Sequence, residues 1–239
     1  MNRIDSSHWL FSRPIAHRGL WNKTITENSL SAYQNAVDNG YPIEIDVFSS
    51  SDGVLYCFHD DNLYRICGVN GLIYNTESAL LNCLSINGKG DKIPTLKEVL
   101  NLVGGKVPIL IEIKNQPDKK IVERLLAELH GCGGEFAVQS FNPLYLITLR
   151  KLAPYITCGL LTTRENKYLE GASFINKIVV KNALFVNKIK PDFISISLCS
   201  PLLNKLKKYK TIRWTITDKE SAEEVIKKGE NIIFENFII

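Results

Sequence analysis

Short apolar runs rich in Val, Ile and Phe alternate with helical patterns along the whole sequence. This alternation is typical of a parallel sheet whose strands are joined by crossover helices. We expect eight strands, at residues 14–17, 43–47, 109–113, 136–140, 157–161, 192–197, 211–216 and 231–234. Eight strands in a chain of 239 residues predict a closed (β/α)₈ TIM barrel. A doubly wound open sheet is disfavoured, because only Gly19 follows the first strand and the GxGxxG phosphate-binding pattern is absent.

Helix ends are marked by capping residues and by proline or glycine. The signals are a Thr95/Glu98 capping box closed by Gly104, N-cap and proline pairs at Asn142-Pro143 and Ser200-Pro201, and a bracket of Asp218 and Gly229. Each of them predicts a helix between two strands.

The connection between the second and third predicted strands is longer than the others. It contains a further apolar run, 54–58, and the pair Asp52-Gly53 favours a hairpin turn before that run. A turn centred on this pair places position 46 opposite position 59, so His59 is expected to return to the side of Asp46. The remainder, about 61–93, is expected to form a small lid over the barrel mouth. Since no linker or repeat is visible, residues 1–239 are predicted to form a single domain.

Composition and charge exclude several classes of protein. The chain has 29 basic and 25 acidic side chains and is 45% hydrophobic, which excludes disordered and low-complexity proteins. The apolar runs are far shorter than the roughly 20 residues of a membrane-spanning helix, and no signal peptide is visible. The six cysteines form no zinc-binding or CxxC pattern, which favours reduced thiols. We therefore expect a soluble, cytoplasmic protein; the oligomeric state stays open.

Lysines are concentrated towards the carboxyl end of the sequence. Residues 176–210 hold eight lysines against the single acid Asp192, and four of them, Lys205, Lys207, Lys208 and Lys210, are expected on one short helix. A solvated helix face is the favoured interpretation, and nucleic acid or an anionic membrane surface is the alternative. Because no nucleic-acid motif accompanies the lysines, we expect neither a nucleic-acid partner nor stable membrane insertion.

Charged residues occur at the strand positions where a (β/α)₈ barrel places its chemistry. His17 and Arg18 follow the first strand, and His59 follows the hairpin. Charges also alternate with apolar residues on the second and third strands, at Glu44, Asp46, Glu112 and Lys114, so these side chains face the lumen. Such converging carboxylates are costly without a cation. Oxygen-only ligation fits Mg²⁺ or Ca²⁺, and the basic residues supply the charge that a phosphate needs. The set indicates phosphoryl chemistry, with the histidines moving protons.

Several short motifs occur in a fixed order between residues 14 and 234. They are Ile15-Ala-His-Arg-Gly19, Glu27-Asn28-Ser29, Ile43-Glu-Ile-Asp-Val47, Asp52-Gly53, Phe58-His-Asp60, Ile93-Pro-Thr-Leu-Lys-Glu-Val-Leu100, Ile111-Glu-Ile-Lys114, Ser140-Phe141 and Trp214-Thr215. In this ordered set the chain resembles the glycerophosphodiester phosphodiesterase family. Two positions depart from the family pattern: Thr26 replaces a proline, and the last strand ends in Phe234-Glu-Asn-Phe237 instead of Thr-Asp-x-Pro.

The resemblance implies both a reaction and a set of site residues. A small-molecule glycerophosphodiester would be hydrolysed to sn-glycerol 3-phosphate and an alcohol. The implied roles are the divalent cation on Glu44, Asp46 and Glu112, acid/base catalysis by His17 and His59, and phosphate binding by Arg18 and Lys114. Glu27 and Trp214 are candidates for the substrate pocket. We expect His59 to be the acid, because the hairpin sets it beside the alcohol half, and His17 to be the base.

Two alternatives remain open at this point. One is a phospholipase-D-like lipid phosphodiesterase of the same superfamily, although the nearest apolar loop, 79–84, is short and contains Asn82. The other is a non-catalytic phosphate-binding barrel. The presence of all the polar site residues argues against the second alternative.

Overall fold

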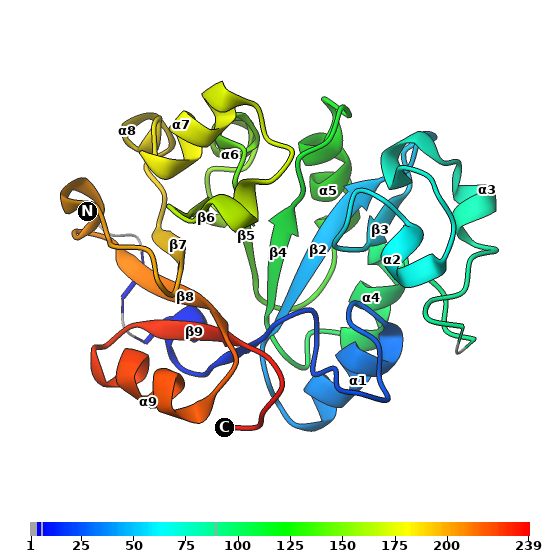
Figure 1. Ribbon diagram of the computed structural model, residues 1–239, viewed down its shortest axis with the longest axis horizontal. Helices are drawn as coiled ribbons and strands as arrows, with labels where there is room; N and C mark the ends of the chain where they lie inside the picture. The colour runs from blue at the N-terminus through cyan, green and yellow to red at the C-terminus, as the bar shows by residue number, and fades with distance from the viewer. Residues whose placement is uncertain (1–3, 6, 89) are drawn as a thin grey trace. The chain divides into compact units, whose positions relative to one another are not determined.

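A computed structural model describes residues 4–5, 7–88 and 90–239 of the chain (Figure 1). The chain separates into two compact units, each described by itself below. The first-half unit comprises Ala16–Phe136, and the second-half unit comprises Met1–Ile15 together with Ala137–Ile239. The prediction of a single domain stays a prediction. No helix in the described part of the chain is long and apolar enough to cross a membrane.

The first-half unit holds a short parallel sheet with helices between its strands. Its elements are the end of β1 (Ile15–Ala16), α1 (Leu30–Asp38), β2 (Ile43–Ser49), β3 (Leu55–Cys57), α2 (Tyr64–Cys67), the 3₁₀ helix η2 (Ile73–Asn75), α3 (Ser78–Leu81), α4 (Leu96–Val103), β4 (Ile109–Ile113) and α5 (Ile121–Leu129). β2 pairs in parallel with β1 and β4, whereas β3 pairs with it antiparallel. Every residue of β2 and β4 is buried, as expected for parallel strands covered on both faces.

The hairpin between β2 and β3 forms, but its register differs from the prediction. Ser49 pairs with Leu55 and Val47 with Cys57, so Asp46 lies opposite Phe58 and not opposite His59. The cause is one extra turn residue: the amide of Ser50 donates to the carbonyl of Val54 at 2.8 Å, which leaves three residues in the loop. The last of them, Gly53, has a φ of +94°, a left-handed value that favours glycine.

The insertion that follows the hairpin has its own small core. Its α2, η2 and α3 are short, and their apolar side chains pack against the hairpin; the buried residues are Phe48, Tyr56, Phe58, Leu63, Ile66, Ile73, Leu81, Ile86 and Ile93. The insertion ends where α4 begins at the capping box of Thr95 and Glu98, and α4 ends at Gly104, as predicted. This segment is therefore a folded element fixed to the hairpin. Its role as a lid stays a prediction.

The second-half unit holds strands β5 to β9, which pair in parallel in chain order. Its elements are the 3₁₀ helix η1 (Trp9–Phe11), β5 (Phe136–Ser140), α6 (Pro143–Leu152), β6 (Thr157–Thr162), η3 (Asn166–Leu169), α7 (Phe174–Lys181), α8 (Val186–Ile189), β7 (Phe193–Ser197), η4 (Asn204–Leu206), β8 (Lys210–Ile216), α9 (Lys219–Lys227) and β9 (Asn231–Phe234). The predicted caps Asn142 and Asp218 begin α6 and α9. All six cysteines lie in the described part of the chain, and none forms a disulfide.

Two predictions about this unit are wrong. Ser200-Pro201 begins no helix, because the Ser200 hydroxyl is already used: it accepts from the amide of Arg164 at 2.8 Å and bonds the Ser197 hydroxyl at 2.7 Å. The predicted lysine-bearing helix is also absent from the described chain there, since only the three-residue η4 forms and Lys210 already begins β8.

Candidate active site

Three carboxylates converge on two neighbouring strands of the first-half unit. Glu44 and Asp46 point to the same face of β2, and Glu112 of β4 lies beside Asp46 in register. One oxygen from each carboxylate lies within 4.8 Å of the others, and all three residues are buried. The structure thus brings the three predicted metal ligands together.

Burial and mutual repulsion govern the protonation of this cluster. Burial raises the pKa of Glu44 well above its ordinary value, and the charges of Asp46 and Glu112 raise it further. Burial also raises the pKa of Glu112. The pKa of Asp46 moves the other way: burial opposes its ionisation, but the positive charge of Lys114 and other neighbours outweighs burial. A cluster of buried oxygen donors that repel one another fits a hard divalent cation.

Two basic side chains flank the carboxylates. The Nζ atom of Lys114 lies 3.2 Å from an oxygen of Asp46 and 2.9 Å from an oxygen of Glu112. The backbone amide of Arg18 donates to Glu44 at 3.1 Å, and its Nε lies 3.4 Å from Asp46. Arg18 has a left-handed φ of 56°. The predicted phosphate-binding residues therefore lie at the cluster.

Asn28 is a site residue that the sequence-based assignment left out. Its amide donates to Asp46 at 3.0 Å, and its carbonyl oxygen accepts from the hydroxyl of Tyr33 at 2.7 Å. Asn28 is buried and has a left-handed φ of 50°. Only its place in the Glu27-Asn28-Ser29 motif could have singled it out, because it acts through another side chain.

The two predicted catalytic histidines differ in their surroundings. The Nδ1 atom of His59 lies 2.7 Å from a carboxylate oxygen of Asp60. The pKa of Asp60 lies well below its ordinary value: burial opposes ionisation, but hydrogen bonds from His59 and Arg65 outweigh it. An ionised carboxylate only accepts, so Nδ1 carries the proton. Burial lowers the pKa of His59 to about 4, so the ring is neutral at pH 7. His17 is half-buried directly after β1, and its protonated form would lower the pKa of Asp46.

A chain of ion pairs and hydrogen bonds links Arg18 to His59 through Arg65 of the insertion. Arg65, on α2, donates to both carboxylate oxygens of Glu27, at 3.0 and 2.7 Å, and it also bonds Asp60. Glu27 in turn accepts from Arg18 at 2.7 Å. The chain of contacts therefore runs from Arg18 through Glu27, Arg65 and Asp60 to His59. Neither Arg65 nor Asp60 was assigned a role from the sequence, because both act through other side chains.

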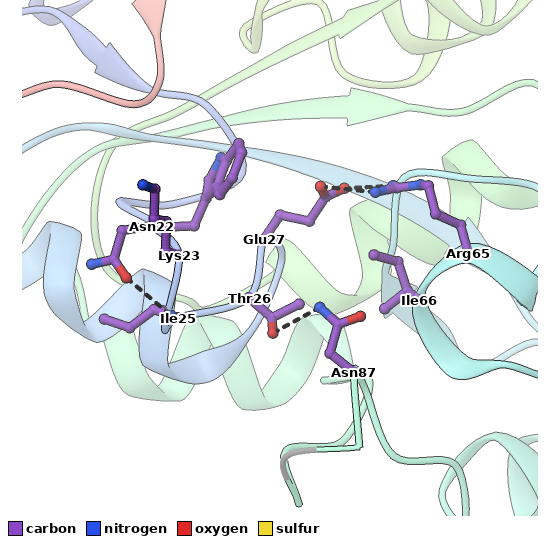
Figure 2. A pocket seen from close by; sticks show the side chains of 9 residues that line it. Asn22, Lys23, Ile25, Thr26, Glu27, Arg65, Ile66 and Asn87 are labelled. Carbon is purple, nitrogen blue, oxygen red and sulfur yellow. Dashed lines mark hydrogen bonds and ion pairs between the residues drawn. The ribbon is translucent and has the colours of Figure 1, made fainter.

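A cavity of about 190 Å³ adjoins this chain of ion pairs (Figure 2). Its wall is formed by the loop before α1 and by the insertion, and the lining residues are Trp21, Asn22, Lys23, Ile25, Thr26, Glu27, Arg65, Ile66 and Asn87. Figure 2 shows the Glu27–Arg65 ion pair on one side and the hydrogen bond from Asn87 to Thr26 on another. Glu27 thus lines the cavity and also belongs to the chain of ion pairs.

Trp214, the other predicted pocket residue, belongs to the second-half unit. It lies on β8 and packs edge-on against Phe141 and Tyr168, with ring centroids 5.7 and 4.8 Å away. Among the described residues, its buried indole nitrogen has no hydrogen-bond partner. Its role in a substrate pocket stays a prediction.

Comparison with known proteins identifies the family. The family model described as "Glycerophosphoryl diester phosphodiesterase family" matches residues 17–238. The chain belongs to this family. A glycerophosphodiester phosphodiesterase of Caldanaerobacter subterraneus subsp. tengcongensis is 30% identical over 231 residues, and the match covers 90% of each chain.

Solved structures agree with this family in fold. An Oleispira antarctica phosphodiesterase in complex with the product sn-glycerol-3-phosphate matches with a TM-score of 0.77 at 23% identity, covering 93% of this chain and 92% of that one. A Thermotoga maritima glycerophosphodiester phosphodiesterase matches with a TM-score of 0.70 at 24% identity, covering 93% and 94%. The chain has the predicted (β/α)₈-barrel fold and, as a member of this family, is a phosphoric diester hydrolase. Membership of this family favours the enzyme over the non-catalytic alternative.

Proposed function

We propose that Glu44, Asp46 and Glu112 hold one divalent cation, Mg²⁺ or Ca²⁺, and that glycerophosphodiesters are hydrolysed there to sn-glycerol 3-phosphate and an alcohol. The observation that carries this proposal is the buried cluster of carboxylate oxygens within 4.8 Å of one another. When bound, the cation would polarise the phosphoryl group and offset its negative charge.

The formal charges of the site balance with such a cation and substrate. The three carboxylates of the cluster and the two cations Arg18 and Lys114 leave one net negative charge. A divalent cation and a phosphodiester monoanion together add one positive charge, so the formal charges of these five side chains, the cation and the substrate sum to zero. A buried site is most stable when its charges are compensated. Arg18 and Lys114 are the residues that we place on the phosphate oxygens.

The surroundings of His59 support a role opposite to the one expected from the sequence. Neutral His59, with Nδ1–H directed at Asp60, presents an unprotonated Nε2, which is the form of a general base. We therefore assign the base to His59 and the proton donor for the leaving alcohol to His17. Asp60 fixes the tautomer and the orientation of the His59 ring.

The cavity beside Glu27 is the place that we propose for the alcohol half of the substrate. It is lined from the insertion by Arg65, Ile66 and Asn87 and from the loop before α1 by polar groups, among them Lys23. This lining suits a small polar head group that carries hydroxyl or anionic groups. Head-group preference would then depend on the insertion more than on the carboxylates.

A panel of substrates tests the proposal. Glycerophosphocholine, glycerophosphoglycerol, glycerophosphoinositol and lysophosphatidylcholine are each supplied with purified enzyme. Release of sn-glycerol 3-phosphate is measured enzymatically for the three glycerophosphodiesters, and release of choline is measured for lysophosphatidylcholine, whose other product keeps its acyl chain. We expect the free glycerophosphodiesters to be cleaved with sn-glycerol 3-phosphate as product. The variant Ile66→Ala should change the ranking of head groups, while Leu80→Ala, an exposed residue elsewhere on the insertion, should not. Selective cleavage of lysophosphatidylcholine would support the lipid phosphodiesterase instead.

We also place this activity in the cytoplasm, where the products would enter glycerol and lipid metabolism. The six cysteines, none of them in a disulfide, support this location.

A further inference from the structure

Helix α7 of the second-half unit is apolar on the side that faces solvent. Phe174, Ile175 and Ile178 follow the spacing of one helical face, and they are 78%, 71% and 40% exposed. Side chains of this size are normally turned towards a core, and a contiguous exposed group of them marks an interaction site.

The opposite side of α7 is what fixes the helix to the unit. Val180 is buried, and its carbonyl accepts a 2.7 Å hydrogen bond from the buried hydroxyl of Thr162 at the end of β6. Ser173 caps the first turn by accepting from the amide of Asn176. The buried contact of the helix therefore lies at Val180, away from the most exposed side chains, Phe174 and Ile175.

The turn after α7 extends the exposed apolar group. Leu184 and Phe185 are 38% and 44% exposed, and Phe185 has a left-handed φ of 68°, which is uncommon for an aromatic residue. The amide of Leu184 bonds the carbonyl of Val179 at 2.9 Å, so the turn is anchored to the helix. We call Phe174, Ile175, Ile178, Leu184 and Phe185 the α7 surface. In Figure 1, α7 and α8 are the yellow helices that carry this segment.

The segment that carries the α7 surface is basic, although Glu170 directly precedes it. Between Gly171 and Lys190 the sequence has no acidic residue and four lysines, Lys177, Lys181, Lys188 and Lys190. Lysine side chains with apolar residues beside them suit the boundary of a bilayer, because the stem can lie on the apolar side and the ammonium can reach the head groups.

We propose that the α7 surface docks the protein reversibly on an anionic lipid bilayer. The apolar side chains would enter the boundary of the acyl chains, and the lysines would contact anionic head groups. A protein partner fits less well, since lysine is depleted in the cores of protein interfaces. The docking is peripheral, and it is independent of the catalytic proposal, because no residue of the α7 surface belongs to the carboxylate site.

Vesicle co-sedimentation of the full chain tests the proposal. Phosphatidylcholine vesicles are compared with vesicles that also contain phosphatidylglycerol. We expect binding to the anionic vesicles, weakened by salt, and little binding to phosphatidylcholine alone. The double variant Phe174→Ser/Ile175→Ser should lower the partition coefficient about tenfold or more. Lys177→Gln/Lys181→Gln should lower it about fivefold per lysine on anionic vesicles.

A matched control removes equally exposed apolar side chains elsewhere in the same unit. Leu144 and Tyr155 are 61% and 77% exposed, and Leu144→Ser/Tyr155→Ser should leave vesicle binding unchanged. Unchanged hydrolysis of a water-soluble glycerophosphodiester shows that each variant is folded. No binding to anionic vesicles, or equal binding by wild type and the α7 variant, would overturn the proposal. An oligomer that light scattering finds in wild type and not in the α7 variant would also overturn it, since a second copy would then cover this surface.

Discussion

Among the three carboxylates of the cluster, Asp46 has contacts with three neighbouring side chains, and these contacts fix its position and its charge. Lys114 and Arg18 lie near its oxygens, and Asn28 donates to it. The strand spacing of Glu44, Asp46 and Glu112 predicts their meeting, because period two fixes the face of a strand. The same reasoning could not find Asn28, Asp60 or Arg65. Their positions depend on loops and on the insertion, whose conformations follow from tertiary contacts.

Asn28 gives the first prediction at this scale. Asn28→Gly keeps the left-handed backbone and removes the donor to Asp46, so the affinity for Mg²⁺ or Ca²⁺ should fall about ten- to hundredfold. Asn236 also has a left-handed φ, of 69°, and Asn236→Gly is the matched control. Calorimetric titration measures both affinities. Equal affinities in Asn28→Gly and wild type would show that Asn28 does not orient the ligand.

The catalytic roles of His17 and His59 can be distinguished with substrates that differ in their leaving group. His17→Ala and His59→Ala should each lower the rate on glycerophosphocholine by about 10² to 10⁴. A nitrophenolate leaves without a proton, so on a nitrophenyl glycerophosphodiester His17→Ala should recover much of its rate and His59→Ala should stay slow. Recovery by His59→Ala instead would restore the assignment expected from the sequence, and recovery by neither variant would exclude both assignments.

At the scale of elements, α2 of the insertion is tied to the site by Arg65. Arg65→Met breaks the bonds to Glu27 and Asp60, and we expect kcat/KM to fall about ten- to hundredfold while cation affinity stays the same. Arg65→Lys keeps the positive charge but cannot form the bidentate hydrogen bond to Glu27. We therefore expect its kcat/KM to lie between that of wild type and that of Arg65→Met. Arg124→Met is the control, because Arg124 pairs with Asp118 at 3.0 Å. Equal activities of Arg65→Met and Arg124→Met would contradict a positioning role.

The hairpin is tied to α3 by Asp52, and this contact depends on pH. Hydrogen bonds from Ser50 and Ser78 lower the pKa of Asp52 to about 2. Because the pKa of Asp52 is lower in the folded than in the unfolded state, its ionised form stabilises the fold. This stabilisation is fully present at pH values above the unfolded-state pKa of about 3.9, and it is lost as the pH falls through the folded-state pKa of about 2. Asp52→Asn should therefore cost up to about 1 kcal/mol at neutral pH, since the group is exposed and screened. Urea unfolding measures the free energies of unfolding of wild type and Asp52→Asn at neutral pH and near pH 2. The two proteins should differ only at neutral pH, and an equal difference at both pH values would contradict the prediction.

The elements also show where sequence patterns are sufficient. The parallel strands follow from buried runs of Val and Ile, and capped helices such as α4 and α9 follow from local hydrogen bonds that the chain supplies itself. The hairpin register differs by one position, because a single extra residue in the turn is invisible to a count based on Asp52-Gly53. The helix predicted to begin at Ser200-Pro201 does not form, because the Ser200 hydroxyl that would cap it accepts from the amide of Arg164, which is distant in sequence.

At the scale of the whole molecule, the family and the fold are predicted better by the ordered set of motifs than by any single helix or strand. The family match runs from residue 17 to residue 238 and so includes both units, although the carboxylate cluster lies entirely within the first-half unit. The barrel could be predicted, because eight alternating repeats of strand and helix leave few other arrangements. The α7 surface was not singled out, since its apolar residues match an ordinary buried helix until the structure shows which side faces solvent.

The central claim is that hydrolysis depends on a cation held by Glu44, Asp46 and Glu112. The most direct test is glycerophosphocholine hydrolysis by enzyme that has been chelated, dialysed and then titrated with Mg²⁺ or Ca²⁺. We predict that activity is lost on chelation and returns with about one cation per chain. Glu44→Gln, which weakens the ligand set, should need much more cation for the same rate. Full activity in the chelated and dialysed enzyme would contradict the account.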